Sequence, residues 1–325
     1  MKILITGGSG FIGTNLIDLL ELQYNNILNI DKVRPNKESH NSYWSECDIL
    51  DYNKFSKIMS DFQPTHVIHL AARTDTDSNV LEDYLENTKG TSNLLSIVKN
   101  IKSIERLTLT STQFVNQYQG VPKNDEDYAA HTTYGESKII NEKDIRGADL
   151  SCIWTIIRPT NIWGPWHKRY PYEFWKILSE NRYFHPGKKK ITRSYGYVGN
   201  VAWQISKILT ASPDLVNRKV YYVGDFPIEL FDWVNEFSKK QIGRNVRVVP
   251  AIIIKSLSLI GEGLKQFKIK FPITLSRYKS MTSSNDAPME ATFEAFGNPP
   301  YSLVTGIEET VDWMKQYHPN LVTIH

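Results

Sequence analysis

Cysteine is almost absent from this chain, which has only Cys47 and Cys152 among its 325 residues and no CxxC pair. A disulfide scaffold and a cysteine-based zinc site therefore lack support, a reducing compartment is expected, and no metal site is predicted. Long apolar runs are also missing: the most apolar stretch, residues 251–260, is interrupted by Lys255 and has about half the length of a membrane span. We expect no integral membrane segment and interpret this stretch as a core or interfacial helix, with a peripheral membrane contact as the alternative.

A strong charge of one sign is missing as well. The net charge is +3, and lysines and arginines are spread along the chain rather than concentrated in a stripe, so we expect no nucleic-acid partner. The apolar run in residues 1–7 is too short for a signal peptide before glycines interrupt it. These absences favour a cytoplasmic protein whose mild positive charge suits a small anionic ligand.

What the chain does have is a regular alternation of short apolar runs and longer helix-period segments in its first half. This is the pattern of βαβ units around a parallel sheet. The predicted strands are residues 2–6, 26–31, 66–71, 106–111 and 152–158. Helical segments between them include residues 11–21 and 80–99. The sequence therefore predicts an α/β fold: a Rossmann-type, doubly wound parallel sheet with a smaller mixed α/β C-terminal domain.

Residues 6–13 read TGGSGFIG and place glycines in a GxxGxxG spacing, directly after a predicted strand and at the start of a helix. Gly7 permits the tight turn, Gly10 lets the backbone approach a pyrophosphate, and Gly13 lets helix and strand pack closely. The N–H groups at the start of the helix then face the negative charge. The spacing predicts a dinucleotide site.

Asp31 ends the next predicted strand, 18 residues beyond Gly13. A carboxylate at this place can accept hydrogen bonds from the adenosine ribose and would repel a 2′-phosphate, which favours NAD as the cofactor. Lys32 and Arg34 follow directly and could neutralise such a phosphate, so NADP stays open.

The alternation weakens after Pro165, where prolines and aromatic residues divide the chain into shorter elements. We predict an NAD-binding domain over residues 1–165 and a mainly substrate-binding domain over residues 166–325. Residues 194–225 are expected to return to the first domain, because 194–209 has the pattern of a turn followed by a helix.

Tyr134 and Lys138 have a spacing that places both side chains on one face of a helix. There the ammonium can favour the phenolate, so that the tyrosine can act as a base near neutral pH. Tyr172 and Lys176 have the same spacing. However, Tyr134 follows a strand whose end offers the hydroxyl of Thr112 at the carboxyl edge of the sheet, where ligands of such folds bind.

Several motifs occur together in the order found in a known family. The chain resembles the extended short-chain dehydrogenase/reductase superfamily, and within it the NAD-dependent nucleotide-sugar epimerase/dehydratase family, over nearly its whole length. The motifs that carry the resemblance are residues 6–13 (TGGSGFIG), 47–49 (CDI), 69–72 (HLAA), Asn87 with 90–91 (GT), 111–112 (ST), Tyr134 to Lys138, and 158–165 (RPTNIWGP). Their number and order argue against coincidence.

The resemblance implies roles for individual residues at the cofactor. Asp48 and Ile49 would flank the adenine, with Asp48 accepting from its amino group, and Asn87 would support the site from a neighbouring helix. Ala71 and Ala72 would let the cofactor pass close to the backbone. The complete predicted cofactor-binding set is Gly7, Gly10, Phe11, Ile12, Asp31, Asp48, Ile49, Leu70, Ala71, Ala72, Asn87, Tyr134 and Lys138.

The resemblance also implies the catalytic set Thr112, Tyr134 and Lys138. Lys138 would bind the nicotinamide ribose as well as act on Tyr134, and Thr112 would hydrogen-bond the reacting sugar oxygen. Arginine suits a diphosphate because its guanidinium binds two oxygens at once. The predicted residues for a nucleotide-sugar substrate are Thr112, Asn161, Arg193 and Arg277.

Some of these residues also have a purely structural interpretation. Asp48 could cap a turn, Asn161 could satisfy its own loop backbone, and Thr112 could be a solvated strand end. Arg193 and Arg277 could be solvated surface arginines.

The resembled family starts several reactions in one way, by removing hydride from a sugar carbon while Tyr134 takes the hydroxyl proton. Dehydratases carry a further Asp-Glu pair where this chain has Gln113 and Phe114, which cannot transfer protons near neutral pH. Epimerisation and keto-sugar reduction stay open, and Asp31 favours the epimerase because a retained NAD suits a redox-neutral cycle. A non-catalytic NAD-binding regulator is the alternative of another class, although a silent relative would be free to lose Tyr134 or Lys138.

The resemblance further implies a homodimer. In that family, the helix matching residues 80–99 and the helix that carries the tyrosine pair across a twofold axis as a four-helix bundle. The expected role is in carbohydrate biosynthesis.

Overall fold

The computed structural model describes residues 1–117, 120–169, 174–266 and 273–322. They form two compact units that alternate along the sequence. The first unit contains Met1–Ile162, Gly196–Asp225 and Ala287–Pro300, and the second contains Trp163–Tyr195, Phe226–Asp286 and Tyr301–His325. The chain therefore passes from one unit to the other five times.

A seven-stranded parallel sheet is the centre of the first unit, with the strand order β11-β6-β5-β4-β1-β2-β3. Its strands are β1 (Ile3–Thr6), β2 (Ile27–Asp31), β3 (Trp44–Glu46), β4 (His66–His69), β5 (Arg106–Thr110), β6 (Ile153–Pro159) and β11 (Lys219–Val223). Five of them match the predicted strands to within two residues, and β3 and β11 are additional. Because β1 pairs with β2 on one side and β4 on the other, the strand order reverses there, and ligands bind at such points.

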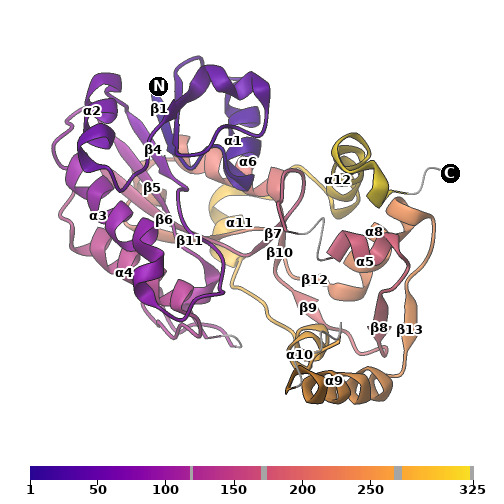
Figure 1. Ribbon diagram of the computed structural model, residues 1–325. Coiled ribbons are helices and arrows are strands. Elements are labelled where there is room, and N and C mark those ends of the chain that lie inside the picture. Colours follow the sequence, from indigo (N-terminus) through magenta and orange to yellow (C-terminus); the bar gives the residue numbers. More distant parts are fainter. Residues whose placement is uncertain (118–119, 170–173, 267–272, 323–325) are drawn as a thin grey trace. The chain divides into compact units, whose positions relative to one another are not determined.

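Helices cover both faces of this sheet, with α2, α3 and α4 on one face and α1, α6 and α11 on the other (Figure 1). The helices of the first unit are α1 (Phe11–Leu20), α2 (Tyr52–Phe62), α3 (Leu85–Val98), α4 (Thr133–Gly147), α6 (Val198–Thr210), α7 (Pro213–Val216) and α11 (Glu290–Phe296), with 3-10 turns η1 (Glu38–Tyr43), η2 (Leu81–Tyr84) and η3 (Gln113–Val115). Strand side chains such as Leu4 and Val67 are buried with Phe55 of α2 and Leu94 of α3. The predicted doubly wound, Rossmann-type α/β fold is confirmed.

The second unit combines very short strands with helices of up to 16 residues. Its strands form two pairs, β8 (Phe184–Pro186) with β13 (Arg247–Val249) and β9 (Thr192–Arg193) with β12 (Ile228–Glu229). Its helices are α5 (Lys176–Ser179), α8 (Leu230–Ile242), α9 (Ala251–Gln266), α10 (Leu275–Thr282) and α12 (Leu303–Tyr317), with the turn η5 (Pro319–Leu321). Two further strands, β7 (Asn161–Trp163) and β10 (Tyr195–Tyr197), pair where the chain passes between the units.

Aromatic side chains fill the interior of the second unit. Trp233 of α8 lies 5.9 Å from Trp163 and 5.0 Å from Phe237 between ring centroids, with both contacts edge to face. Phe174 stacks on Trp233 at 4.9 Å. Such rings bury large apolar areas, which compensates for the small size of the strands.

The apolar stretch 251–260 forms the first part of α9. One face of this helix is buried through Ile254 and Ser258, but Ile252 and Leu259 are exposed. Of the two interpretations of this stretch, a helix buried in the core is wrong, and a helix with one buried and one exposed face agrees with the structure. Among the residues that the structure describes, no helix is both long and apolar enough to cross a membrane.

Candidate functional site

The glycine-rich turn connects β1 to α1 at the carboxyl edge of the sheet. Gly7 has a φ of +75°, and a Cβ atom there would lie 2.5 Å from the backbone nitrogen of Ala71. The segments that follow β1 and β4 thus approach too closely for any side chain at this position. At Gly13 a Cβ would lie 2.5 Å from the Cα of Gly8, as close packing of the helix start requires. Gly10 is the N-cap of α1 and has no side chain to cap it, which suits an anion at the helix N-terminus.

Asp31 is the last residue of β2, beside this turn. Its Oδ2 accepts a hydrogen bond from the backbone N–H of Ser9 at 3.1 Å, and its Oδ1 accepts one from that of Val33 at 3.0 Å. These two bonds fix the carboxylate next to the glycines. This is the place at which folds of this type bind the adenosine ribose.

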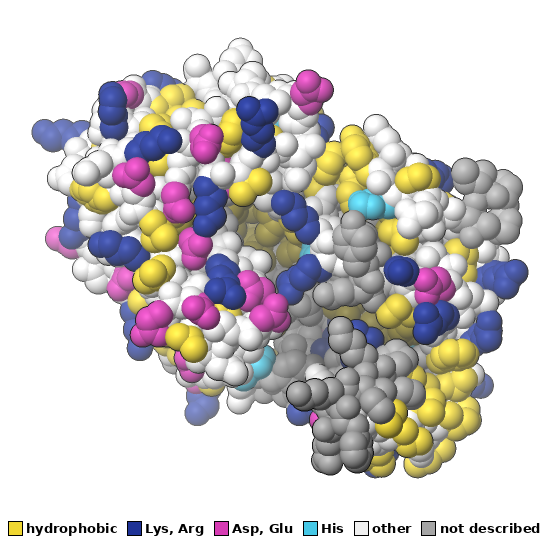
Figure 2. All heavy atoms as spheres, in the orientation of Figure 1, with side chains coloured by type: hydrophobic (Ala, Val, Ile, Leu, Met, Phe, Trp, Pro, Cys, Tyr) yellow, Lys and Arg dark blue, Asp and Glu magenta, His cyan; other side chains and the backbone are white. Residues whose placement is uncertain are grey.

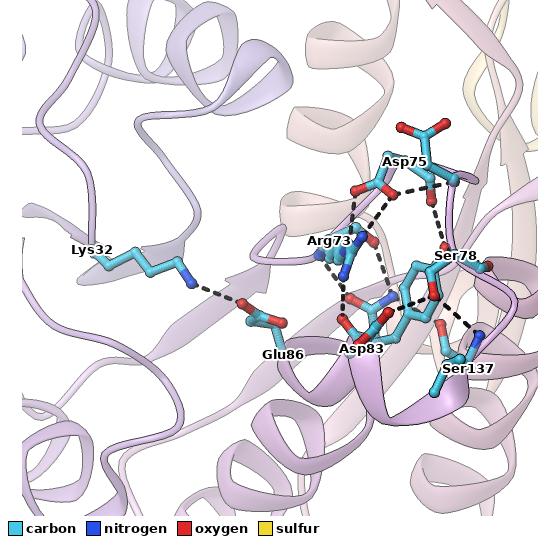
Figure 3. A network of polar contacts seen from close by, with 11 residues as sticks. Lys32, Arg73, Asp75, Ser78, Asp83, Glu86 and Ser137 are labelled. Carbon is cyan, nitrogen blue, oxygen red and sulfur yellow. Dashed lines mark hydrogen bonds and ion pairs between the residues drawn. The ribbon is translucent and has the colours of Figure 1, made fainter.

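Two cations follow Asp31, and both are engaged within the protein. Lys32 forms an ion pair with Glu86 of α3 at 2.8 Å, drawn in Figure 3, and lies 3.6 Å from Asp48. The guanidinium of Arg34 lies over the ring of Trp44, 5.6 Å from its centroid. These contacts weaken the sequence argument for NADP.

Asp48 and Ile49 follow β3. The Oδ1 of Asp48 accepts a hydrogen bond from the backbone N–H of Leu50 at 2.9 Å, so the residue does cap a turn, in line with its structural interpretation. Ile49 is buried against α3, where a Cβ at Gly90 would lie 2.4 Å from the Cδ1 of Ile49. The packing of Ile49 thus explains the glycine of the 90–91 motif.

Asn87 of α3 connects two parts of the site. Its Oδ1 accepts from the backbone N–H of Arg73 at 2.8 Å, and its Nδ2 donates to the carbonyl of Arg73 at 3.0 Å and to the Oγ of Ser137 at 2.8 Å. The side chain is fully buried. Asn87 therefore holds the segment after β4 against α4, next to Tyr134 and Lys138, which is the geometry that its expected supporting role requires.

Arg73, which the sequence did not single out, orders the same segment. Its guanidinium donates to both oxygens of Asp75, at 2.8 and 3.1 Å, and to the carbonyl of Asp83 at 2.8 Å (Figure 3). It also lies over the ring of Tyr84, whose centroid is 6.3 Å from that of Tyr134. Through Arg73 and Tyr84, the segment after β4 thus packs next to Tyr134.

The predicted helix that carries Tyr134 and Lys138 is α4. It begins with a capping hydrogen bond, in which the backbone N–H of Gly135 donates to the Oγ1 of Thr132 at 3.0 Å. Both Tyr134 and Lys138 are buried in this helix, four residues apart. The expected placement of the pair on one helix is therefore present, although their chemical role is not established by it.

Lys138 carries a buried ammonium group. Its Nζ donates to the backbone carbonyl of Thr110, the last residue of β5, at 2.9 Å. Burial lowers the pKa of Lys138 to about 8, and the carboxylate of Glu142 opposes this shift. Burial and the charge of Lys138 together lower the pKa of His69, at the end of β4, to about 3. At neutral pH a positive charge thus lies at the carboxyl edge of β5, with a neutral imidazole nearby.

Thr112 is buried, so its interpretation as a solvated strand end is wrong. Its Oγ1 accepts from the backbone N–H of Phe114 at 3.3 Å and caps η3. The ring of Phe114 lies edge to face with the rings of Tyr134, at 6.3 Å, and His131, at 5.3 Å. A Cβ at Gly135 would lie 2.4 Å from the carbonyl oxygen of Phe114. The turn that begins at Thr112 thus packs directly on the start of α4.

Glu142 is a functional-site neighbour that sequence reasoning missed. It lies one helical turn beyond Lys138 and is fully buried, with its two oxygens accepting from the Nε and Nη2 of Arg158 at 2.9 and 2.7 Å. The hydroxyls of Ser111 and Tyr128 donate to the same carboxylate. Burial and this carboxylate raise the pKa of Tyr128 to about 12. The sequence signal is a third polar residue at the same four-residue interval as Tyr134 and Lys138.

Asp225, also missed, lies just after β11. It accepts hydrogen bonds from the backbone N–H of Tyr197 and the Nδ2 of Asn200, both at 2.7 Å. Burial raises the pKa of Asp225 to about 6, and these two donors oppose the shift. The carboxylate thereby fixes the start of α6.

The residues predicted for the substrate lie in both units. Asn161 is the half-buried first residue of β7. Arg193 of β9 is buried, so its interpretation as a solvated surface arginine is wrong, and its Nη2 donates to the carbonyl of Ser280 in α10. Arg277 is exposed on the same helix, one turn earlier. The second unit thus brings Arg193 to the helix of Arg277.

Comparison with known protein families bears on the fold and on this site. The model of the NAD dependent epimerase/dehydratase family matches residues 3–224. The chain belongs to this family. The resemblance seen in the motifs is thereby confirmed, as is NAD as the cofactor.

The relatives of this chain within the enzyme family include epimerases and dehydratases. The dTDP-L-rhamnose 4-epimerase of Burkholderia thailandensis is 34% identical over 35% of this chain and 35% of its own. An epimerase of Escherichia coli O157:H7, N-acetyl-alpha-D-glucosaminyl-diphospho-ditrans,octacis-undecaprenol 4-epimerase, is 27% identical over 62% of this chain and 60% of its own. The dTDP-glucose 4,6-dehydratase of Haemophilus influenzae is 34% identical over 31% of this chain and 33% of its own. These alignments span about a third to three fifths of the relatives' lengths.

Solved structures of epimerases share the fold over nearly the whole chain. UDP-glucose 4-epimerase of Thermotoga maritima, solved with UDP-glucose, has a TM-score of 0.72 at 20% identity and covers 98% of this chain and 99% of its own. The corresponding enzyme of Thermus thermophilus, in complex with NAD, has a TM-score of 0.70 at 21% identity and covers 97% and 99%. At these identities the likeness concerns the fold.

Proposed function

We propose that this chain is an NAD-dependent nucleotide-sugar epimerase in which Tyr134 is the acid and base. The observation that carries the proposal is the buried pair of Tyr134 and Lys138 at the carboxyl edge of β5, next to the capped turn of Thr112. A cation in this position favours the phenolate, and burial strengthens its effect. The epimerases among the relatives and structural neighbours support the same reading.

In the proposed reaction, the phenolate of Tyr134 takes the proton of a sugar hydroxyl, and Thr112 holds the reacting oxygen by a hydrogen bond. Bound NAD supplies the hydride acceptor and, in the reverse sense, the donor. The keto sugar turns over in the pocket, and Tyr134 returns the proton to its oxygen after reduction on the other face. Lys138 holds the nicotinamide ribose, while Asp31 and the glycine turn hold the adenosine ribose and the pyrophosphate.

The second unit would hold the nucleotide diphosphate of the substrate. Arg193 and Arg277 are proposed to bind its phosphate oxygens and Asn161 its sugar or diphosphate, because guanidinium groups match such oxygens in pairs. Relatives that act on dTDP-, CDP- and UDP-linked sugars support a nucleoside diphosphate as the common element.

Dehydration is disfavoured in this proposal, although dehydratases occur among the relatives. The positions beside Thr112 are Gln113 and Phe114, and the ring of Phe114 is packed against the rings of His131 and Tyr134. An amide and a phenyl ring cannot exchange protons near neutral pH. Elimination of water would therefore need an acid and a base from elsewhere.

A homodimer is part of the proposal, but fewer apolar side chains of residues 80–99 are exposed for the dimer contact than expected. Leu95 and Val98 of α3 are buried in the core of the first unit, so they cannot contact a second chain. Val80, which precedes the helix, and Leu85, its first residue, remain exposed. Light scattering at micromolar concentration should give the mass of two chains, and a monomeric mass would remove the dimer from the proposal.

The reaction is tested with a panel of UDP-, dTDP-, GDP- and CDP-sugars followed by product NMR. With a substrate deuterated at the reacting carbon, an epimerase returns the label to its product without added cofactor. A reductase consumes stoichiometric reduced nicotinamide, and a non-catalytic regulator converts no sugar. Consumption of reduced nicotinamide, or the absence of any conversion, would overturn the proposal that the chain is an epimerase.

A further inference from the structure

Helix α9 in the second unit is apolar on two opposite faces. Ile254 and Ser258 are buried on one face. On the other face four side chains are exposed: Ile252 by 66%, Ile253 by 49%, Leu259 by 55% and Ile260 by 54%. A helical period brings these four together on one side of the helix, and we call them the α9 apolar face. Figure 2 shows hydrophobic side chains gathered at its lower right, where Figure 1 places α9.

This face differs from the other exposed apolar residues of the described chain. Leu22 and Leu215 of the first unit, for example, are exposed singly, which is normal for a soluble protein. Four large aliphatic side chains on one helix form a contiguous patch, and such patches mark sites of interaction. On the same side of the helix, Ser256 lies between the two pairs and Gly263 follows one turn later, and both are small, so the aliphatic side chains project beyond them.

The sequence around the α9 apolar face is strongly basic. Residues 244–286 contain eight Lys and Arg but two Asp and Glu, a net charge of +6. The whole chain carries +3, so the remainder carries −3. Lys255 lies on α9 at the edge of the apolar face, and Arg244 and Arg247 are exposed in the segment that leads into this helix.

We propose that the α9 apolar face docks onto a lipid bilayer that contains anionic lipids. The aliphatic side chains enter the boundary between headgroups and acyl chains, while Lys255 and Arg247 meet lipid phosphates. A second copy of this chain fits the face less well, because it would bring the same net positive charge into the contact. An anionic bilayer offers an apolar interior to the aliphatic side chains and negative headgroups to Lys255 and Arg247.

The experiment is sedimentation of the full-length protein with vesicles of phosphatidylcholine alone or mixed with phosphatidylglycerol. We expect binding to the mixed vesicles, weaker binding to phosphatidylcholine, and release as salt rises to about 0.5 M. The double variant Ile252→Ser/Leu259→Ser should lower the partition coefficient by about tenfold or more. The matched control Leu22→Ser/Leu215→Ser, which also replaces two exposed leucines or isoleucines, should bind like the unaltered chain. Retained NAD binding shows that both variants are folded.

Three results would overturn the proposal. The unaltered chain could fail to sediment with the mixed vesicles, which would leave an acidic protein as the partner of this face. Both double variants could lose binding equally, which would assign binding to the surface in general. The α9 variant could halve the mass in light scattering without changing vesicle binding, which would make the face a contact between two copies.

Discussion

The two units differ in what they bury. Beneath Tyr134, the first unit buries charged and polar groups that hold one another, with Lys138 on the carbonyl of Thr110 and Glu142 on Arg158. The second unit buries a cluster of aromatic rings around Trp233 and exposes aliphatic side chains on α9. Polar groups in a low-dielectric interior fix geometry and proton affinity, whereas rings and aliphatic surfaces provide shape. We infer that chemistry is concentrated in the first unit and recognition in the second.

Removal of the hydroxyl of Tyr134 should have the largest effect, and it tests whether the chemistry lies in the first unit. Tyr134→Phe keeps the ring in its contacts with Tyr84 and Phe114, so folding and NAD binding should survive while kcat falls by on the order of a hundredfold or more. Single-turnover kinetics on the substrate found by the sugar panel, with NAD affinity measured in parallel, checks this. Undiminished turnover would remove Tyr134 from the mechanism.

A second substitution tests whether the buried charges act as a structural unit. Glu142→Gln leaves the guanidinium of Arg158 without its buried counter-charge, and we expect the free energy of unfolding to fall by roughly 3 kcal/mol. Glu136→Gln, at an exposed position of the same helix, is the control and should change it by less than about 0.5 kcal/mol. Urea denaturation measures the free energy of unfolding of both variants. Equal losses would show that the ion pair of Glu142 and Arg158 contributes little to stability.

The second unit should respond in a different way. Arg193→Lys keeps the charge but loses the planar fork, so KM for the nucleotide sugar should rise by about tenfold while NAD affinity stays constant. Arg182→Lys, at an exposed site in the same unit, serves as the control. A parallel loss of NAD affinity would contradict the division of labour between the units.

The smallest expected effect is a pH dependence. The pKa of Lys138 is lowered to about 8 in the folded protein, so between this value and its unfolded value the unfolded state binds more protons. The contribution of Lys138 to the free energy of unfolding should therefore rise with pH in this window, by roughly 1 kcal/mol per pH unit. The difference between the unaltered protein and Lys138→Met, measured by denaturation from pH 7.5 to about 9.5, reports it. Parallel stability curves would mean that the folded pKa is not lowered.

The sequence predicted the parts of the molecule that depend on local patterns. The parallel strands and the Gly7 turn follow from period and spacing, and α4 with Tyr134 and Lys138 follows from a helical interval. The pairing of Glu142 with Arg158 was not predicted, because the two lie 16 positions apart, one in α4 and the other in β6, and burial is a property of the fold. The sequence left open whether residues 251–260 form a core or an interfacial helix, since an apolar run alone does not say which side is covered.

The return of Ala287–Pro300 to the first unit, after two passages through the second, has a consequence for synthesis on the ribosome. Thr292 of α11 donates a hydrogen bond to the carbonyl of Tyr222 at the edge strand β11, and it is buried there. The first unit is thus incomplete until residue 300 has left the exit tunnel. The first unit therefore cannot be completed before most of the second unit has been synthesised, which limits folding in order along the chain.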